Sequence, residues 1–249
     1  MHGRDSSQTP STSSEAHRRF QSFKSPARVI TPQMSSRSEV LEEFFISLQE
    51  AMWRILSRSW ESVELRDLRR IAAADVAYRG DLALAVAICW DLERGEPVEE
   101  KWLACEALYP YVPGLLFLRE APPMLRAVKL LEHEWSLLLV NGHGLLHPRR
   151  MGLAVILGLV LGKPALGVAK SLLVGVEGPG EDWGPVEVSG EILGYWFKTR
   201  SGGKFYVSPG YLLTVDQVPE LVRILGSRYP EPLAYADKLS KRLARSLSP

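Results

Sequence analysis

Hydrophobic positions divide the chain into a first stretch without periodicity and a much longer stretch with it. Residues 1–37 are rich in Ser, Thr, Gln, Pro and Arg and show no apolar repeat. We therefore predict that they form a disordered, Ser/Arg-rich N-terminal segment. From residue 39 to residue 56 apolar side chains recur every three to four positions, which predicts an amphipathic helix; they are Val40, Leu41, Phe44, Phe45, Leu48, Met52 and Ile55.

Three apolar, strand-like runs follow at residues 71–78, 82–90 and 98–108. The short Arg79–Gly80–Asp81 turn joins the first two closely enough for a hairpin, so we expect an antiparallel meander. The pattern then changes to helices and strands in alternation. We expect helices within 114–133 and 148–161, buried strands at 136–140 and 165–168, a strand pair at 190–199 and 204–207, and final helices at 215–225 and 233–247.

This order of elements restricts the fold. Parallel strands joined through helices cross over with one handedness, so the fourth strand can lie beside the first. The prediction is one α/β domain over residues 38–249, with a ribonuclease H-like mixed sheet: three antiparallel strands, then alternating helices and parallel strands, with helices on both faces. Other mixed α/β folds remain compatible with the pattern alone.

Composition narrows the class of protein further. A chain of 249 residues with 46% hydrophobic residues can bury one full core. The two cysteines cannot form a disulfide framework, and the longest apolar run, residues 153–161, is far shorter than the ~20 residues that span a bilayer. No apolar signal segment is visible at the N-terminus. We expect a cytoplasmic protein with no membrane segment.

The charge distribution bears on possible partners. Residues 1–38 hold six of the 30 Lys and Arg residues but only two of the 29 acids, so the rest of the chain is slightly acidic. Such a body binds phosphates only through a local basic patch or a bound cation. A basic N-terminal arm that helps to hold a polyanion is a second possibility.

Four segments combine polar side chains with positions where ligands gather. Asp75 interrupts an otherwise apolar strand and faces either solvent or a site. In 110–114, Pro-Tyr-Val-Pro-Gly, a rigid loop carries Tyr111 at its tip, where the ring can wedge into a base stack or simply complete a turn. The buried strand ending in Asn141 runs into Gly142-His143-Gly144, and the next strand ends in Lys170, which is otherwise an ordinary solvated lysine.

Together, in this order, these segments resemble the endonuclease V family along nearly the whole of residues 40–245. The matching motifs are Asp-Val-Ala-Tyr (75–78), Pro-Tyr-Val-Pro-Gly-Leu-Leu (110–116) with Arg-Glu (119–120), Val-Asn-Gly-His-Gly (140–144), His-Pro-Arg-Arg (147–150), Gly-Val-Ala-Lys (167–170), Val-Ser-Pro-Gly (207–210) and Tyr-Pro-Glu-Pro (229–232). The resemblance implies DNA containing deoxyinosine as substrate, or inosine-containing RNA in some members. It also implies cleavage at the second phosphodiester bond 3′ to the hypoxanthine. We expect Mg²⁺ as cofactor, with Mn²⁺ as a substitute, and a monomer.

The resemblance also assigns roles by position. Asp75 matches the first metal ligand, Glu120 a second acid and Asp237 an acid of the last helix, while Lys170 matches the lysine near the scissile phosphate. Tyr111 matches the wedge. The base pocket, lined largely by backbone and apolar atoms, falls on Gly114, Leu116, Gly142, Gly152 and Leu153, and further contacts to nucleic acid on Pro113, His147 and Arg149. His147 positions the leaving strand or is a structural histidine.

Two positions depart from the family. Asn141 stands where members carry an aspartate that binds the metal directly, and Tyr211 replaces a common histidine. Asn keeps an oxygen donor but removes a negative charge from a site whose task is to bind Mg²⁺, so we predict a large loss of catalysis with base recognition intact.

Three explanations of Asn141 stay open: an engineered substitution that traps substrate, a natural member that now only binds, or a site that tolerates the neutral ligand with reduced activity. The Asn-Gly order also permits spontaneous deamidation to Asp. The alternative function is an inactive protein that binds inosine-containing nucleic acid, and another ribonuclease H-like nuclease, such as a junction resolvase, is a third hypothesis.

Overall fold

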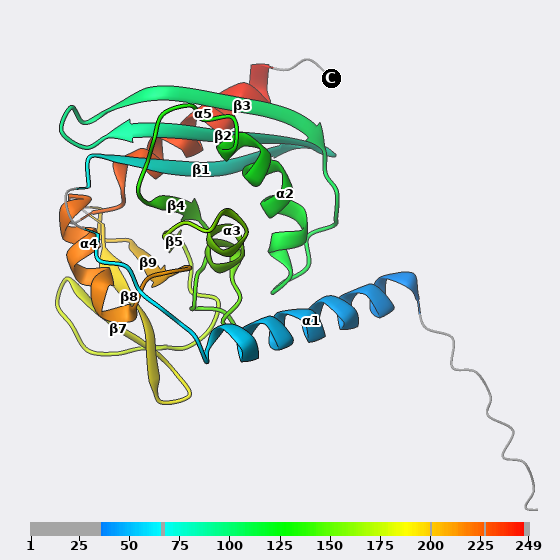
Figure 1. Cartoon of the computed structure of the whole chain (residues 1–249), viewed down its shortest axis with the longest axis vertical. Helices are drawn as coiled ribbons and strands as arrows, with labels where there is room; N and C mark the ends of the chain where they lie inside the picture. The colour runs from blue at the N-terminus through cyan, green and yellow to red at the C-terminus, as the bar shows by residue number, and fades with distance from the viewer. Residues whose placement is uncertain (1–35, 66–67, 200, 227, 247–249) are drawn as a thin grey trace, which may run out of the picture. The chain divides into compact units, whose positions relative to one another are not determined.

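A mixed sheet, in the strand order β3-β2-β1-β4-β5-β9-β8-β7-β6, organises the described part of the chain (Figure 1). The computed structural model describes residues 36–65, 68–199, 201–226 and 228–246, and residues 38–249 form one unit. The predicted disorder of residues 1–37 concerns a segment that lies almost entirely outside the described residues, and it stays a prediction.

The first three strands form the expected antiparallel meander. They are β1 (Arg70–Arg79), β2 (Leu82–Asp91) and β3 (Glu96–Glu106). β1 pairs with β2 from Arg70↔Asp91 to Arg79↔Leu82, around a turn in which Gly80 has a φ of 56°. Only two residues separate these strands, so the hairpin predicted from the Arg79–Gly80–Asp81 turn is confirmed.

The two parallel strands lie where the crossover argument places them. β4 (Leu138–Asn141) is parallel to β1, and β5 (Ala165–Ala169) is parallel to β4. Helix α2 (Leu116–Val128) precedes β4, and helix α3 (Leu153–Leu161) connects β4 to β5. The ribonuclease H-like fold is thereby confirmed. α3 begins five residues later than predicted, because residues 148–152 form a turn in which Arg150 takes a φ of 54°.

The far half of the sheet differs from the expectation in extent. β9 (Lys204–Pro209) pairs antiparallel with β5 and with β8 (Glu191–Lys198), as the predicted strand pair requires. Beyond β8 lie β7 (Trp183–Val188) and the short β6 (Val176–Glu177), which were not predicted. β7 contains Gly184 and Pro185, residues typical of loops, and such residues are tolerated towards the edge of a sheet.

Helices cover both faces of the sheet. Helices α2 and α3 and the C-terminal half of α1 (Arg37–Leu56) pack on one face, against the even-numbered side chains of β1 such as Ala72 and Ala74. Helices α4 (Val218–Ile224), which follows the 3₁₀ turn η1 (Val215–Gln217), and α5 (Glu231–Ser246) pack on the other face, against Ile71 and Ala73. Side chains alternate along a strand, so Asp75 points towards the α5 face. Among the described helices, none combines the length and the apolarity that crossing a membrane requires.

Candidate active site

Asp75 and Asn141 meet where β1 and β4 run side by side. The parallel pairing ends at Ala74↔Val140, which brings the next residue of each strand together. The Asn141 amide donates from Nδ2 to Asp75 Oδ1 at 2.6 Å, and the Ser240 hydroxyl of α5 donates to Asp75 Oδ2 at 2.5 Å. Asp75 is only 3% exposed. Burial raises the pKa of its carboxyl above the usual value, and the two hydrogen bonds offset only part of this rise.

Glu120 supplies a second, partly buried carboxyl from the first half of α2. Its desolvation, and next the negative charge of Asp75, together raise the pKa of this carboxyl to about 8. Among the described residues, no hydrogen bond reaches its carboxylate. Asp75 and Glu120 are therefore close enough to repel each other, and Glu120 has no donor to stabilise its charge.

Asp237 and Lys170 form an ion pair beside these acids. Lys170 follows β5 directly, and its Nζ lies 2.9 Å from Asp237 Oδ1. Lys241, one turn further along α5, donates to both oxygens of Asp237 at 2.8 Å. Burial alone would raise the pKa of the Asp237 carboxyl, but hydrogen bonds from the two lysines hold it below the usual range. The charge of Asp237 in turn raises the pKa of Asp75.

These side chains offer oxygen atoms that a divalent cation can bind. Within the described ranges, no group of three or more His, Cys, Asp or Glu side chains is arranged to hold a metal ion. Asp75 and Glu120 nevertheless suit a cation, because a positive charge between two mutually repelling carboxylates would stabilise both. Asn141 can contribute an amide oxygen as a third, neutral donor. The residues therefore fit a hard cation, with one negative charge fewer than three carboxylates would provide.

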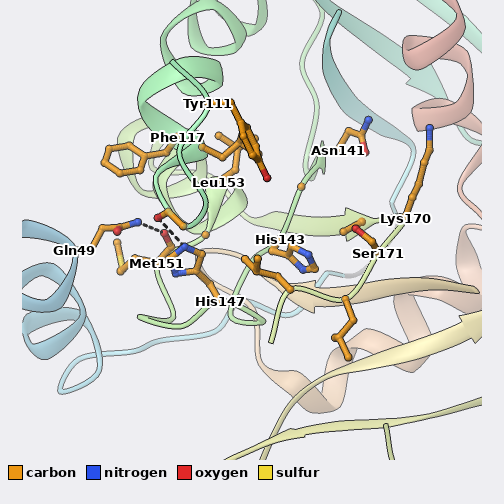
Figure 2. Close-up of a pocket in the computed structure, with 17 residues that line it drawn as sticks. Gln49, Tyr111, Phe117, Asn141, His143, His147, Met151, Leu153, Lys170 and Ser171 are labelled. Atoms are coloured by element: carbon orange, nitrogen blue, oxygen red, sulfur yellow. Dashed lines mark hydrogen bonds between the residues drawn. The ribbon is translucent and has the colours of Figure 1, made fainter. Parts of the chain in front are cut away.

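A cavity of about 240 Å³ opens next to Asn141 and Lys170. Figure 2 shows Tyr111, Phe117 and Leu153 on one side of it and Asn141, Lys170 and Ser171 on the other. Its volume lies below the ~300–1,000 Å³ typical of sites for drug-sized ligands, which suits a smaller planar group. Many of the predicted site residues line it: Tyr111, Gly114, Leu116, Asn141, Gly142, His147, Gly152, Leu153 and Lys170.

The predicted wedge residue lies at the rim of this cavity. Tyr111 is 64% exposed although it is a large aromatic residue, so its ring is available to a partner. Gly152 lines the same cavity, where its backbone lies close to a second backbone segment. A Cβ at Gly152 would lie 2.3 Å from the carbonyl oxygen of His143 and 2.4 Å from that of Gly144. Only glycine allows this close approach of two backbone segments.

Two side chains of the 147–150 turn, His147 and Arg149, form hydrogen bonds to the loop that carries Tyr111. The Gly114 carbonyl accepts from His147 Nε2 at 3.0 Å and from Arg149 Nη2 at 2.7 Å. His147 Nδ1 accepts from the Arg149 backbone N–H at 3.2 Å, so His147 is neutral with its proton on Nε2. Burial first, and then the Arg149 charge, lower the pKa of His147 to about 4. These contacts give both side chains a structural role.

Five predicted residues do not line the cavity. Asp75, Glu120 and Asp237 lie in the acid cluster beside it, whereas Pro113 is exposed on the loop next to Gly114. Arg149 lies behind the cavity, where its Nε donates to Gln49 Oε1 at 2.8 Å. The assignments of these residues to metal and to nucleic acid remain predictions.

Several residues of the site were not predicted from the sequence. Gln49 of α1 lines the cavity, is 1% exposed and donates from Nε2 to the Met151 carbonyl at 2.8 Å. A polar residue on the apolar face of an amphipathic helix was the available signal. His143 and Tyr229 each bury a polar atom, Nδ1 and Oη, for which the described residues provide no hydrogen-bond partner. The Tyr229 ring lies 5.6 Å from Lys170 Nζ, next to the acid cluster.

The chain is similar in sequence and in fold to known proteins. Residues 53–238 match the family model described as Endonuclease V. A relative named Endonuclease V from Thermus thermophilus is 42% identical over 194 residues, which cover 74% of this chain and 86% of the relative. The solved catalytic domain of human Endonuclease V superposes with a TM-score of 0.70 at 27% identity, covering 82% of this chain and 97% of that domain. The Ciona intestinalis Endonuclease V, solved with DNA containing an inosine, shares the fold with a TM-score of 0.74 at 21% identity, covering 86% of this chain and 100% of that one.

Proposed function

This chain belongs to the endonuclease V family of nucleases, and from that premise we propose that it recognises hypoxanthine in nucleic acid and cuts the second phosphodiester bond 3′ to it. One observation carries the proposal: the Asp75–Asn141 contact and the Lys170–Asp237 pair adjoin a cavity that has the exposed ring of Tyr111 at its rim. A base held in the cavity would place its own strand beside the acids. The Ciona relative was solved with inosine-containing DNA, which supports the same substrate class here.

The cavity suits a flipped purine without a dedicated base-reading side chain. Gly114, Gly142 and Gly152 contribute backbone, and Leu116 and Leu153 contribute apolar surface. An extruded base needs such a pocket, and the strand that it leaves is unstacked at a cost of a few kcal/mol. Tyr111 would fill the gap in the stack, because it is exposed at the rim.

The chain's own residues would hold the cofactor and position the reacting strand. Asp75, Glu120 and the Asn141 amide oxygen would bind Mg²⁺, with Mn²⁺ as a substitute and Asp237 close by. When bound, such a cation polarises phosphate oxygens and activates water. Lys170 would stabilise charge on the scissile phosphate, because its side chain is 52% exposed and Asp237 holds its Nζ in place.

Asn141 is where this chain departs from a strong nuclease site. Its Nδ2 donates to Asp75 Oδ1, so the amide proton occupies an oxygen that a cation would use. To serve as a ligand, Asn141 must turn its oxygen inward and give up that bond, which for a charged acceptor is worth about 1.5–3 kcal/mol. We therefore propose weak cleavage and intact base recognition. The same contact favours the second candidate, a protein that binds inosine-containing nucleic acid without cutting it.

The decisive experiment compares the natural chain with Asn141→Asp. Oligonucleotides of DNA and RNA, with inosine or adenosine at one position, are incubated with each protein and Mg²⁺, Mn²⁺ or EDTA. The proposed function expects slow inosine-dependent cleavage by the natural chain and fast cleavage by Asn141→Asp at the same bond. Cleavage by the variant alone supports the binding protein with a lost ligand. No inosine-dependent cleavage or binding by either protein refutes both candidates.

The remaining expectations belong to the same proposal. A monomer in the cytoplasm is the simplest setting for this nuclease, since its two cysteines, Cys89 and Cys105, are free. An intact-mass measurement before the assay detects conversion of Asn141 to Asp by deamidation, which would otherwise mimic natural activity.

A further inference from the structure

The outer face of α5 carries a stripe of basic side chains. Lys238, Lys241, Arg242 and Arg245 are all exposed and lie at helical spacings of three, four and seven residues, which places them on one side of the helix. We call these four residues the α5 basic face. The opposite side of the helix, with residues such as Leu239, is buried against the sheet.

Shallow hollows run along this face without an acidic lining residue. One hollow of about 550 Å³ is lined by the α5 basic face and Ser246. A neighbouring hollow of about 350 Å³ lies between α5 and the end of β1, where Lys241 and Arg245 face Tyr78 and Arg79. Both hollows are open and positively charged, a combination suited to an extended polyanion.

The α5 basic face begins at the acid cluster. Lys241 donates to both carboxylate oxygens of Asp237, which also pairs with Lys170. From Asp237 to Arg245 the helix rises by about 12 Å. One strand of a duplex advances about 3.4 Å per phosphate, so the face can follow about three phosphates beyond the cluster.

Pairing within the protein accounts for only one of these four charges, that of Lys241 with Asp237. Some basic residues elsewhere lie against carboxylates, as the exposed Arg223 does with Glu220 and the partly buried Arg150 with Glu191. Among the described residues, Lys238, Arg242 and Arg245 form no such ion pair. The helix dipole favours a cation in the last turn, where Arg245 lies, but it does not favour Lys238 two turns earlier. Four like charges on one side of a helix repel one another, and an external anion would relieve that repulsion.

We propose that the α5 basic face binds the sugar–phosphate backbone of the nucleic acid beyond the scissile bond, independently of base sequence. The inference rests on the proposed function, because it assigns a role in holding the same substrate. The α5 basic face also supplies the local basic patch that a slightly acidic protein needs to bind phosphates. Base recognition would remain with the cavity, and the α5 basic face would contribute affinity and register.

The test measures how binding depends on salt. Lys238→Gln/Arg242→Gln/Arg245→Gln removes three charges and leaves Lys241, which contacts Asp237, in place. A matched control, Arg94→Gln/Arg126→Gln/Lys129→Gln, removes three exposed charges from the β2–β3 turn and from α2. Fluorescence anisotropy in EDTA gives Kd for duplexes with and without inosine at several salt concentrations.

The proposal expects a specific change in the first variant. Its slope of log Kd against log salt should fall by about 2–3, since each phosphate contact to duplex DNA contributes about 0.9. Affinity for both duplexes should fall by the same factor, about ten-fold or more at low salt, so the preference for inosine is unchanged. The control should match the natural chain. Single Lys238→Gln and Arg245→Gln variants, each expected to lower the slope by about 0.9, cover the case in which the triple variant does not fold.

The possible failures are distinguishable. An unchanged slope in the triple and single variants overturns the role of the α5 basic face, even where inosine is still preferred. Loss of the inosine preference with an unchanged slope does the same. Absence of any inosine preference in the natural chain refutes the proposed function, while the slope measured on plain duplex still decides the α5 basic face. Charge-dependent binding to anionic lipid vesicles, with no change in nucleic-acid slope, would assign the face to a membrane surface and overturn the proposal.

Discussion

Asn141→Asp is the sharpest perturbation of this site, because it acts in opposite directions with and without a cation. The variant replaces an amide that donates to Asp75 Oδ1 at 2.6 Å with a third carboxylate, beside the buried Asp75 and the partly buried Glu120. A hydrogen bond to a charged acceptor, worth about 1.5–3 kcal/mol, is lost. Two like charges about 4 Å apart repel by about 4 kcal/mol at an effective dielectric constant of about 20.

Relaxation of the side chains reduces this repulsion, so we expect the metal-free variant to be less stable by about 2–4 kcal/mol. A domain of this size loses about 2–4 °C in Tm per kcal/mol, which predicts a decrease of about 5–15 °C in EDTA. Bound Mg²⁺ or Mn²⁺ should reverse the effect. The cation neutralises the third carboxylate. In the variant it also binds without breaking the hydrogen bond from the Asn141 amide to Asp75, which alone should raise the affinity for the cation by about ten-fold or more.

Thermal unfolding in EDTA and in a series of Mn²⁺ concentrations measures both effects, and calorimetry gives the Mn²⁺ affinity directly. Ser240→Ala is the matched control: it removes the other hydrogen bond to Asp75 without adding charge. We expect it to lower stability without improving cation binding. If Asn141→Asp is as stable as the natural chain in EDTA and binds Mn²⁺ no more tightly, the three positions do not form a cation site, and the reasoning is refuted.

Three further predictions concern the surroundings of the site. Gln49→Leu leaves its buried Met151 and Arg149 partners unsatisfied and should cost about 2–3 kcal/mol in urea unfolding, together with weaker inosine binding; unchanged stability would contradict the bonding described. Tyr111→Ala should leave stability within about 0.5 kcal/mol, because the ring is exposed, but weaken binding to inosine duplexes while Tyr111→Phe retains it; equal binding by all three proteins would reject the wedge. Although partial burial opposes it, backbone N–H donors after α2 lower the pKa of Glu99 to about 2. Glu99 should therefore stabilise the fold above about pH 4.5 and lose that contribution, about 1–2 kcal/mol, as pH falls towards 2; a Glu99→Gln variant with the same acid unfolding curve would disprove it.

The order of elements could be predicted because it depends on local patterns. The meander and the crossovers follow from periodicity, turn residues and the handedness of connections, and the structure confirms them. β7 was not predicted because it contains Gly184 and Pro185, and these residue types indicate a loop when only the local sequence is considered. Its pairing with β8 is a long-range contact that no single segment reveals.

The sequence by itself, through motifs that match a family, determined the prediction that Asp75, Asn141 and Lys170 belong to one site. Only the tertiary structure decided what each atom does. It turned the Asn141 amide towards Asp75 and placed Arg149 beneath the Gly114 carbonyl instead of at the surface. It also aligned the charges of the α5 basic face beside the acid cluster. These outcomes depend on packing between segments far apart in the chain, where burial and hydrogen-bond geometry select one orientation, and residue order alone does not encode them locally.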